Sequence, residues 1–360
     1  MFDFPSAPTV GQVYDKYTWD GEKWITGAPN NVNVYAPQKN YIINGGMQIA
    51  QESGGAASSA TYFWPVDMFS MNFNATSGVY SCSRVSSPTP GGSPARIRTT
   101  VTTPDAAVAA TDLVWISTQV EGSRLIDLLL GTALAKTFTL RFGVKAPAGT
   151  YGVSFCNNAT NRVYVAEYVI APGEANTDVV KTITVPGDVT GTWLTDTQAG
   201  IHIRWGLMCG STYAGAPNVW GTANLISSAN QYNFMGTNGN VFELFDVAMY
   251  QGTVAPAYVL PDYVTELKLC ERYIQMLDVA IVGSTGTATG NAHFATLIHR
   301  TEMRASPTIT VQVALALSVA TYTAGGTGQS NRSTRIDVVA TAAGQYLVYS
   351  GTLKLSAKLL

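Results

Sequence analysis

The stretch VFELFDVAMYQGTVAPAYVLPDYVTELKLCERY, residues 241–273, decides the fold because its pattern changes partway along it. Its first part alternates apolar and polar residues, as a half-buried strand does. A turn over residues 252–256 and a break at Pro261 follow. From Asp262 onward, apolar residues recur at three- and four-residue steps, which predicts a short amphipathic helix with Asp262 as its N-cap. The stretch therefore closes a domain of strands and leads into a shorter β module.

Two sequence patterns frame the central part of the chain. The opening pattern is NYIINGGM at residues 40–47, and the closing pattern joins the strand 242–252 to CERY at residues 270–273. The pair resembles bacteriophage tail-fibre and virion appendage proteins whose β-sandwich is similar to a carbohydrate-binding module. Those proteins usually carry aspartate–arginine–tryptophan after the opening, whereas residues 67–69 here read DMF, so a polar-aromatic contact is lost or replaced by apolar packing. The resemblance implies a virion protein built on a jelly-roll-like sandwich.

The composition favours a rigid β protein over a charged helical enzyme. Hydrophobic residues make up 46% of the 360 residues, which supports a buried core, and charged residues make up only 12%, about half the usual share. The net charge of −2 provides no field for nucleic acid, so no nucleic-acid binding is expected. No window holds the ~20 apolar residues of a membrane span, and the start MFDFPSAPTV lacks the features of a signal peptide.

Residues typical of catalytic and metal sites are scattered along the chain. No paired spacing joins the cysteines, which we interpret as small buried hydrophobes made in a reducing cytoplasm; they are Cys82, Cys156, Cys209 and Cys270. None of the three histidines has a companion at metal-ligand spacing, and no nucleotide or hydrolase motif occurs. We therefore expect no metal, no cofactor and no enzymatic activity. The carboxylates considered for a glycosidase pair stand in no recognisable motif: Asp105, Asp112, Glu121, Asp127, Glu167, Asp188 and Asp196.

The first 26 residues form a small unit of their own, followed by a linker. The pair Asp20-Gly21 between aromatic strands predicts a hairpin, and a lone hairpin is marginal in water, so its rings need a cover. Similar segments recur near the ends of phage tail and fibre proteins. Two interpretations stay open: a docking peg for another virion protein, or a cap on this chain's own sandwich. Residues 27–40, with two prolines and four asparagines, are the linker. The docking candidates are Tyr14, Tyr17, Trp19 and Trp24.

The remaining chain predicts an all-β protein with one connecting helix. Residues 41–260 contain many short strand candidates separated by proline and glycine turns, which is typical of an antiparallel β-sandwich. Within them, RLIDLLLGTALA at residues 124–135 has the pattern of a short helix. Residues 261–276 hold the connecting helix, and residues 277–360 form a C-terminal β module. There, MRASP at residues 303–307 resembles the turn that often follows the closing helix in the same phage proteins.

A long polar segment, residues 210–240, is the candidate glycan-binding surface. Long loops inside compact domains are usually functional, and sugar binding needs an aromatic face with amides beside it. The candidate ligand-binding residues are Trp220, Tyr232, Tyr213, Asn218, Asn224 and Asn230. The other interpretation places these aromatic residues in the core or at a subunit interface. A second platform would combine Tyr62, Phe63 and Trp64 with Asp67.

Two functional hypotheses follow from these patterns and the resemblance. In the first, the chain is a tail-fibre or tail-tip component that binds a host surface glycan without cleaving it. The resemblance then implies a homotrimer located in the virion and assembled in the host cytoplasm. In the second, the chain is a head decoration, collar or fibre-anchoring protein that binds only other virion proteins. If the first 26 residues are a docking peg, they contact the other virion proteins under either hypothesis.

Overall fold

A computed structural model of the chain describes residues 4–10, 12–15, 17–19, 22–26, 38–284, 292–317, 319–324, 329–340 and 346–359. Two compact units divide it, residues 1–39 and residues 40–360. Most of the predicted linker and the predicted Asp20-Gly21 turn lie outside the described residues. No helix in the described ranges is long and apolar enough to cross a membrane.

The first unit contains three short strands where the sequence predicts a two-stranded hairpin. They are β1 (Val13–Tyr14), β2 (Tyr17–Trp19) and β3 (Trp24–Thr26), in the order β1-β2-β3. The additional chain reversal, which the sequence does not predict, lies between Tyr14 and Tyr17, and these two residues pair directly. Asp15 has φ 53° there, a left-handed conformation that aspartate tolerates better than most residues. The prediction missed this turn because no glycine marks it.

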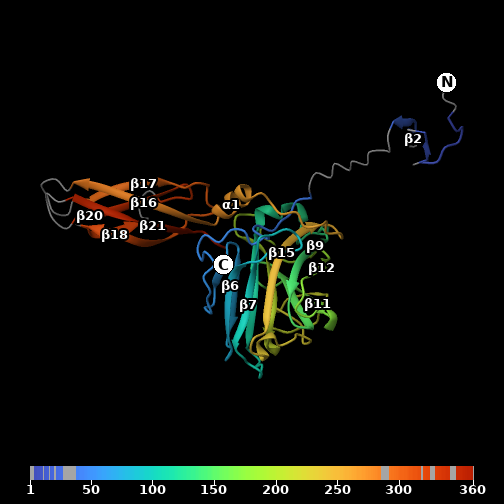
Figure 1. Cartoon of the computed structure of the whole chain (residues 1–360), viewed down its shortest axis with the longest axis horizontal. Helices are drawn as coiled ribbons and strands as arrows, with labels where there is room; N and C mark the ends of the chain where they lie inside the picture. Colours follow the sequence, from blue (N-terminus) through green and yellow to red (C-terminus); the bar gives the residue numbers. More distant parts are fainter. Residues whose placement is uncertain are drawn as a thin grey trace. The chain divides into compact units, whose positions relative to one another are not determined.

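The second unit begins with an antiparallel β-sandwich, as the sequence predicts (Figure 1). A seven-stranded sheet has the order β14-β11-β10-β13-β8-β5-β4, and a five-stranded sheet has the order β12-β9-β15-β7-β6. The strands of the first sheet are β4 (Phe63–Val66), β5 (Phe69–Asn74), β8 (Leu113–Glu121), β10 (Gly149–Cys156), β11 (Val163–Ile170), β13 (Ala199–Cys209) and β14 (Trp220–Gly221). Those of the second are β6 (Val79–Ser86), β7 (Ala95–Thr103), β9 (Phe138–Lys145), β12 (Val179–Val185) and β15 (Val241–Gln251). The chain passes repeatedly between the sheets, which makes the sandwich jelly-roll-like.

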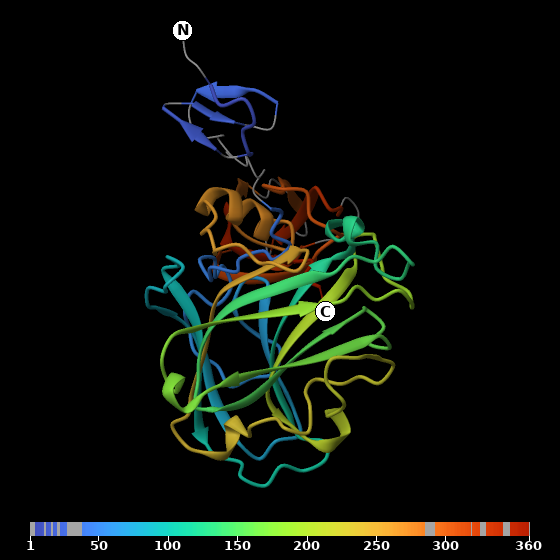
Figure 2. The same cartoon turned by 90° about the vertical axis from the view of Figure 1, so that its right-hand side faces the viewer.

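The hydrophobic core lies between the two sheets, which face each other in Figure 2. Alternation along β15 sends Phe242 and Leu244 inward, where both are fully buried. Phe142 of the five-stranded sheet meets Trp205 of the seven-stranded sheet with ring centroids 5.8 Å apart. Each such buried side chain contributes about 1.5–3 kcal/mol by leaving water. The opposite faces of the sheets carry smaller apolar clusters, one around Cys156, Val163 and Val165 and one around Ala248, Tyr250 and Tyr258.

The opening pattern is held by buried polar contacts. Asn44, fully buried, donates from Nδ2 to the carbonyl oxygens of Ile49 and Asp67, both at 2.8 Å. Its backbone N–H donates to Glu266 Oε1 of helix α1 (Tyr263–Glu271) at 2.8 Å. The Asp67 carboxylate accepts from the backbone and side chain of Gln51. The opening pattern is therefore fastened to the closing helix rather than exposed.

The closing helix has the predicted N-cap and a buried face that differs in part from the prediction. Asp262 accepts from the backbone N–H of Thr265 at 2.9 Å, which confirms the cap. Leu267 and Leu269 pack against the sandwich core, as the spacing predicts, whereas Val264 is 57% exposed and Glu266 is buried. The reason is that Glu266 is drawn inward by its bond to the opening pattern. Burial raises the pKa of the Glu266 carboxyl above its usual range.

The residues just after the helix tie it to the sandwich. Arg272 donates from Nε and Nη2 to Glu121 Oε2 and Oε1 at 2.9 and 2.8 Å. The Tyr273 hydroxyl donates to Glu121 Oε2 at 2.8 Å, and the Ser123 hydroxyl donates to Oε1 at 2.5 Å. Burial alone would raise the pKa of Glu121, but these four bonds outweigh it and lower the pKa. Arg272 and Tyr273 of the closing pattern are therefore structural residues.

The C-terminal module consists of two three-stranded sheets, with the orders β16-β21-β18 and β17-β20-β19. Its tail returns to the sandwich, because Leu359 belongs to the sandwich core. Arg304, from the MRASP segment, donates to the carbonyl oxygens of Ala357 and Lys358 and holds this tail. The strands are β16 (Ile274–Ser284), β17 (Ala292–Ile298), β18 (Thr308–Leu317), β19 (Val319–Ala324), β20 (Ser333–Ala340) and β21 (Tyr346–Ser356).

Residues 124–135 do not form the helix predicted for them. Two 3-10 turns, η1 (Gly122–Arg124) and η2 (Ile126–Leu128), stand at their start. Leu129 then takes φ 53° and Gly131 takes φ 79°. Two left-handed residues so close together end any helix, and the apolar run of the sequence does not reveal them.

Candidate functional site

The predicted ligand-binding segment, residues 210–240, lies along the seven-stranded sheet as a mostly irregular cover. It contains η4 (Ser211–Tyr213), β14 and η5 (Phe234–Gly236). Strand β14 pairs with β11 at the sheet edge, and Leu225 packs on an apolar cluster of β10 and β11. A segment held this closely does not project into solvent as a free binding loop.

Trp220 is built into the sandwich edge. Its indole Nε1 donates to the carbonyl oxygen of Pro186 at 2.8 Å. Its ring centroid lies 5.3 Å from that of Tyr164 and 5.5 Å from that of Trp193. The ring is half-buried, so its contacts are those of a packing residue.

The other predicted aromatic residues lie elsewhere. Tyr232 packs against Tyr151 at 5.7 Å, beside Tyr168, whereas Trp220 packs against Tyr164. Positions 164 and 168 are four residues apart on β11, about 13 Å along the strand. The Tyr213 hydroxyl accepts from Asn74 at 3.3 Å, on strand β5. The three aromatic residues therefore do not share one platform.

The predicted amides are partly occupied by the protein itself. Asn224 Oδ1 accepts from Arg204 at 2.7 Å, and Asn230 Nδ2 donates to Glu167 at 2.9 Å. Asn218 takes φ 65° and donates its backbone N–H to the Val165 carbonyl oxygen. All three side chains are exposed at the surface, so sugar contact by them stays a prediction.

The second predicted platform is split between surface and interior. Tyr62 is 64% exposed, but Asp67 is buried and bonded to Gln51. The Lys358 ammonium lies 4.3 Å from the centre of the Trp64 ring and covers it. The C-terminal tail thus occupies the position that a sugar ring would take on Trp64.

The aromatic residues of the first unit pack on one another. Phe4 stacks on Trp24 at 5.0 Å, and Tyr17 meets the edge of Phe4 at 5.2 Å. Tyr14 and Trp19 contact Trp24 at 6.2 and 5.7 Å. The cluster supplies the cover that the strands need, and docking to a partner stays a prediction.

A groove on the outer face of the five-stranded sheet is a candidate site. Its volume is about 360 Å³. The residues that line it are Arg98, Lys145, Asn176, Gly239, Asn240, Val241 and Glu243. They come from three neighbouring strands and two adjoining loops. None belongs to the predicted ligand set, although Tyr232 reaches its rim through a 3.4 Å bond from Asn240.

The floor of the groove is a row of charged residues set by strand register. Glu243 of β15 pairs with Lys145 of β9 on one side and with Arg98 of β7 on the other. Because the inward neighbours Phe242 and Leu244 are buried in the core, these three side chains point to the outer face. The groove therefore contains two cationic side chains on either side of one carboxylate.

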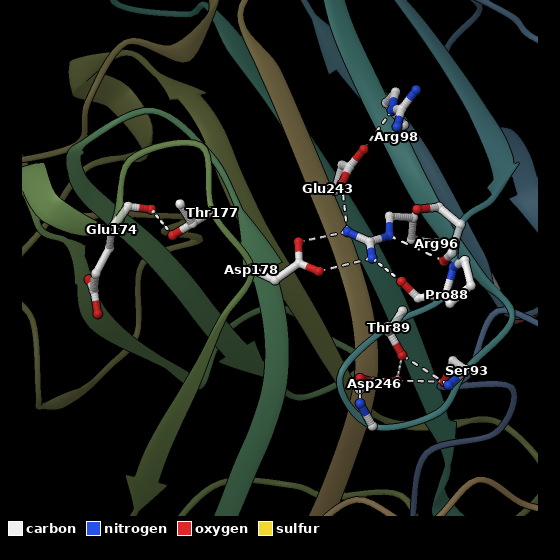
Figure 3. Close-up of polar contacts among 12 residues, drawn as sticks. Pro88, Thr89, Ser93, Arg96, Arg98, Glu174, Thr177, Asp178, Glu243 and Asp246 are labelled. Carbon is white, nitrogen blue, oxygen red and sulfur yellow. Dashed lines mark hydrogen bonds and ion pairs between the residues drawn. The ribbon is translucent and has the colours of Figure 1, made fainter.

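Glu243 is held by two arginines, as Figure 3 shows. Its Oε2 accepts from Arg96 Nη1 at 2.8 Å and its Oε1 accepts from Arg98 Nε at 2.6 Å, while only 1% of its side chain is exposed. Arg96 also binds Asp178 through two bonds. Burial disfavours the charged form of Arg96, but Asp178 and Glu243 outweigh that effect and raise its pKa. The carboxylate is consequently fixed in place.

A layer of packing beneath these charges keeps them rigid. The Arg96 guanidinium lies 4.5 Å from the centre of the Phe245 ring. Phe245 in turn rests on Gly143, where a Cβ atom would lie 2.1 Å from the ring. Only glycine allows this approach, because any larger residue would displace the ring. Figure 3 also shows the loop that Asp246 holds beside it through Thr89 and Ser93.

The groove can donate hydrogen bonds to an oxygen-rich ligand. Arg98 binds Glu243 through Nε alone, and 41% of its side chain is exposed, which leaves both Nη atoms for a ligand. Asn176 is exposed beside the groove, and Asn240 uses its Nδ2 on the Phe234 carbonyl oxygen. Within the described ranges no group of three or more His, Cys, Asp or Glu side chains is placed to hold a metal ion.

Comparison with known proteins found no family model and no curated protein that matches this chain. Among solved structures, the enzymatically active domain of bacteriophage CBA120 tailspike protein 4 aligns at 10% identity over 59% of this chain and 21% of its own, with TM-score 0.31. The family 11 carbohydrate-binding module of Clostridium thermocellum Lic26A-Cel5E aligns at 13% identity over 56% and 99%, with TM-score 0.28. TmCBM61 in complex with β-1,4-galactotriose aligns at 11% identity over 59% and 99%, with TM-score 0.28. Scores this low do not establish a common fold, so the fold rests on the strands described above.

Proposed function

We propose that this chain is a bacteriophage virion appendage protein, a tail-fibre or tail-tip component that binds a host surface glycan without cleaving it. The observation that carries the proposal is the outer-face groove with its free hydrogen-bond donors. The virion assignment rests on the resemblance of the opening and closing patterns at residues 40–47 and 242–273 to phage appendage proteins.

The groove suits a sugar by size and by chemistry. Its volume of about 360 Å³ lies at the lower end of the range for small-ligand sites. Polar donors line it and no aromatic ring does among the described residues, so hydroxyl and carboxylate contacts would replace ring stacking. Individual contacts of this kind are weak. A homotrimer with three grooves would raise the binding strength by avidity.

The state of the groove's carboxylate supports binding without cleavage. Glycoside hydrolysis generally uses two carboxyl groups about 5–9 Å apart. Glu243 is the carboxylate among the described residues lining the groove, and both of its oxygens accept from arginines. A carboxylate fixed in this way is poorly suited to proton transfer. Release of reducing ends from host polysaccharide would contradict this part of the proposal.

A second candidate role is a purely structural one in the virion, through the first unit. The observation that favours it is the aromatic cluster of Phe4, Tyr14 and Trp24, a preformed apolar surface on a very small unit. Tyr14 keeps 40% of its surface exposed. Deletion of residues 1–26 tests this role: a folded chain that no longer joins the particle supports docking, whereas aggregation supports a capping role.

Two experiments test the proposed function. Immunogold labelling of intact virions should place the protein at distal tail or fibre ends, and label over the capsid or neck would favour the structural role. Binding of the purified chain to extracted host surface polysaccharide should be lost in Val241→Trp, which fills the groove. Val169→Trp is the matched control, because Val169 is 54% exposed on strand β11 of the opposite sheet. Equal binding by both variants would contradict the groove as the site.

A further inference from the structure

We propose that the groove selects anionic glycans, with Arg98 and Lys145 as two separate contacts for negatively charged sugar substituents. The inference rests on the proposed function and names the class of glycan. Its starting point is that the groove holds more positive charge than its own carboxylates neutralise.

Lys145 is the unpaired charge of the groove. Its neighbour in register, Glu243, gives both of its oxygens to Arg96 and Arg98. Among the described residues, the Lys145 side chain has no hydrogen bond or ion pair, although it lies in the row of charges and is only partly exposed. An ammonium group without a partner beside a cavity is a site where an anion gains most from binding.

Arg98 offers the second contact. Its Nε atom is used by Glu243, so the outward edge of the guanidinium, with two Nη atoms, remains for a ligand. That edge can bind a carboxylate or phosphate through two parallel hydrogen bonds. Glu243 holds the guanidinium in one orientation, so little side-chain entropy is lost when a ligand binds there.

The charges of the floor leave a local excess of one positive charge. Three cations, Arg96, Arg98 and Lys145, face two carboxylates, Glu243 and Asp178. The whole chain carries a net charge of −2, so the groove has the opposite sign to the protein around it. A neutral sugar would leave Lys145 unmatched, whereas an anionic one completes the row.

The spacing of the two contacts favours a polymer. Strands β7 and β9 both neighbour β15, so Arg98 and Lys145 are rooted two strand spacings apart, about 10 Å. Two side chains rooted this far apart can each meet a different charged substituent. A polysaccharide that carries a charged substituent at intervals can reach both, with Asn176 and Asn240 beside its hydroxyl groups.

The test is binding of the full-length chain to polygalacturonate, measured by titration calorimetry, against the same polymer after reduction of its carboxyl groups. Wild type should bind the acidic polymer at least about tenfold more tightly, and added salt should weaken that binding. Lys145→Gln should lose most of this preference and Lys145→Glu all of it. Lys268→Gln, an exposed lysine on helix α1 with the same charge change, should match wild type. Unchanged melting temperatures would show that the variants are folded.

Binding to a phosphate-bearing polysaccharide, compared with binding to polygalacturonate, shows whether the groove prefers phosphate or carboxylate substituents. If Lys145→Gln weakens binding to the carboxylate polymer or to the phosphate polymer, the inference is supported. The polymer that wild type binds more tightly identifies the preferred substituent. Equal affinity for the acidic and reduced polymers overturns the inference but leaves glycan binding intact. Acidic binding that is equal in Lys145→Gln, Lys268→Gln and wild type also overturns it. Failure to bind any of these polymers or host polysaccharide would refute the proposed function as well.

Discussion

Replacing Glu121 by glutamine should destabilise the protein more than any other single carboxylate change near the closing helix. The Glu121 side chain is 1% exposed and accepts from Arg272, Tyr273 and Ser123. Removing one partner of a buried ion pair costs about 3–5 kcal/mol. Because the Arg272 side chain is 32% exposed, water recovers part of that loss, and we expect about 3 kcal/mol. This is a large fraction of the ~5–15 kcal/mol that stabilises a typical domain.

The assay is urea denaturation at pH 7, followed by tryptophan fluorescence. Glu302→Gln is the matched control, because Glu302 also pairs with an arginine, Arg332, but both side chains are largely exposed. The control should shift the midpoint little. If Glu121→Gln behaved like Glu302→Gln, the four bonds to Glu121 would not hold the helix, and the structural role of the closing pattern would be refuted.

The pH dependence gives a second check on the same carboxylate. Its folded-state pKa lies below the usual glutamate value of about 4.3, because the bonds from Arg272, Ser123 and Tyr273 outweigh burial. The unfolded chain therefore binds a proton first as the pH falls, and the stabilisation by Glu121 is present above that value. It is lost as the pH falls through the lowered pKa. The stability difference between wild type and Glu121→Gln should shrink below about pH 4.

Three further predictions follow from single contacts. Burial lowers the pKa of His202 to about 4, so the free energy of unfolding should fall by at most about 3 kcal/mol as the pH drops from 6.5 to 4. His202→Gln should reduce this pH dependence in urea titrations. Lys358→Met removes the ammonium that binds Glu52 and should cost about 1–2 kcal/mol by thermal denaturation; no change would show that the tail is held without it. Trp220→Ala should cost about 2–3 kcal/mol, because the ring packs on Tyr164; an unchanged melting temperature with lost glycan binding would instead restore Trp220 as a stacking platform.

The sandwich could be predicted from the sequence because its strands and turns depend on residues close together in the chain. Alternation along residues 241–250 predicts a strand, and the proline and glycine turns indicate where each strand ends. The cap at Asp262 is equally local, since it depends on residues three positions apart. The helix predicted at residues 124–135 failed for the same reason: the apolar run is local, but the left-handed Leu129 is imposed by its surroundings.

The packing of polar residues was not predictable in the same way. Glu266 lies on a helix, and the sequence predicts that it faces solvent. It is only 2% exposed, because its carboxylate accepts a hydrogen bond from the backbone N–H of Asn44, 222 positions earlier. Such a contact is decided by how two distant segments meet. Trp220 shows the converse, because its polar sequence neighbours suggest a free platform whereas its ring packs against Tyr164 and Trp193.

The groove shows which part of a binding site the sequence contains. The outward positions of β7, β15 and β9 carry Arg96, Arg98, Glu243 and Lys145, and strand alternation alone places each of them on a polar face. What alternation does not supply is the lateral register that sets Glu243 between Lys145 and Arg98. A shift of two residues in either pairing would separate these charges while keeping every strand amphipathic. Charged residues at outward positions of several strands are therefore the signal to seek, and the register decides whether they form a site.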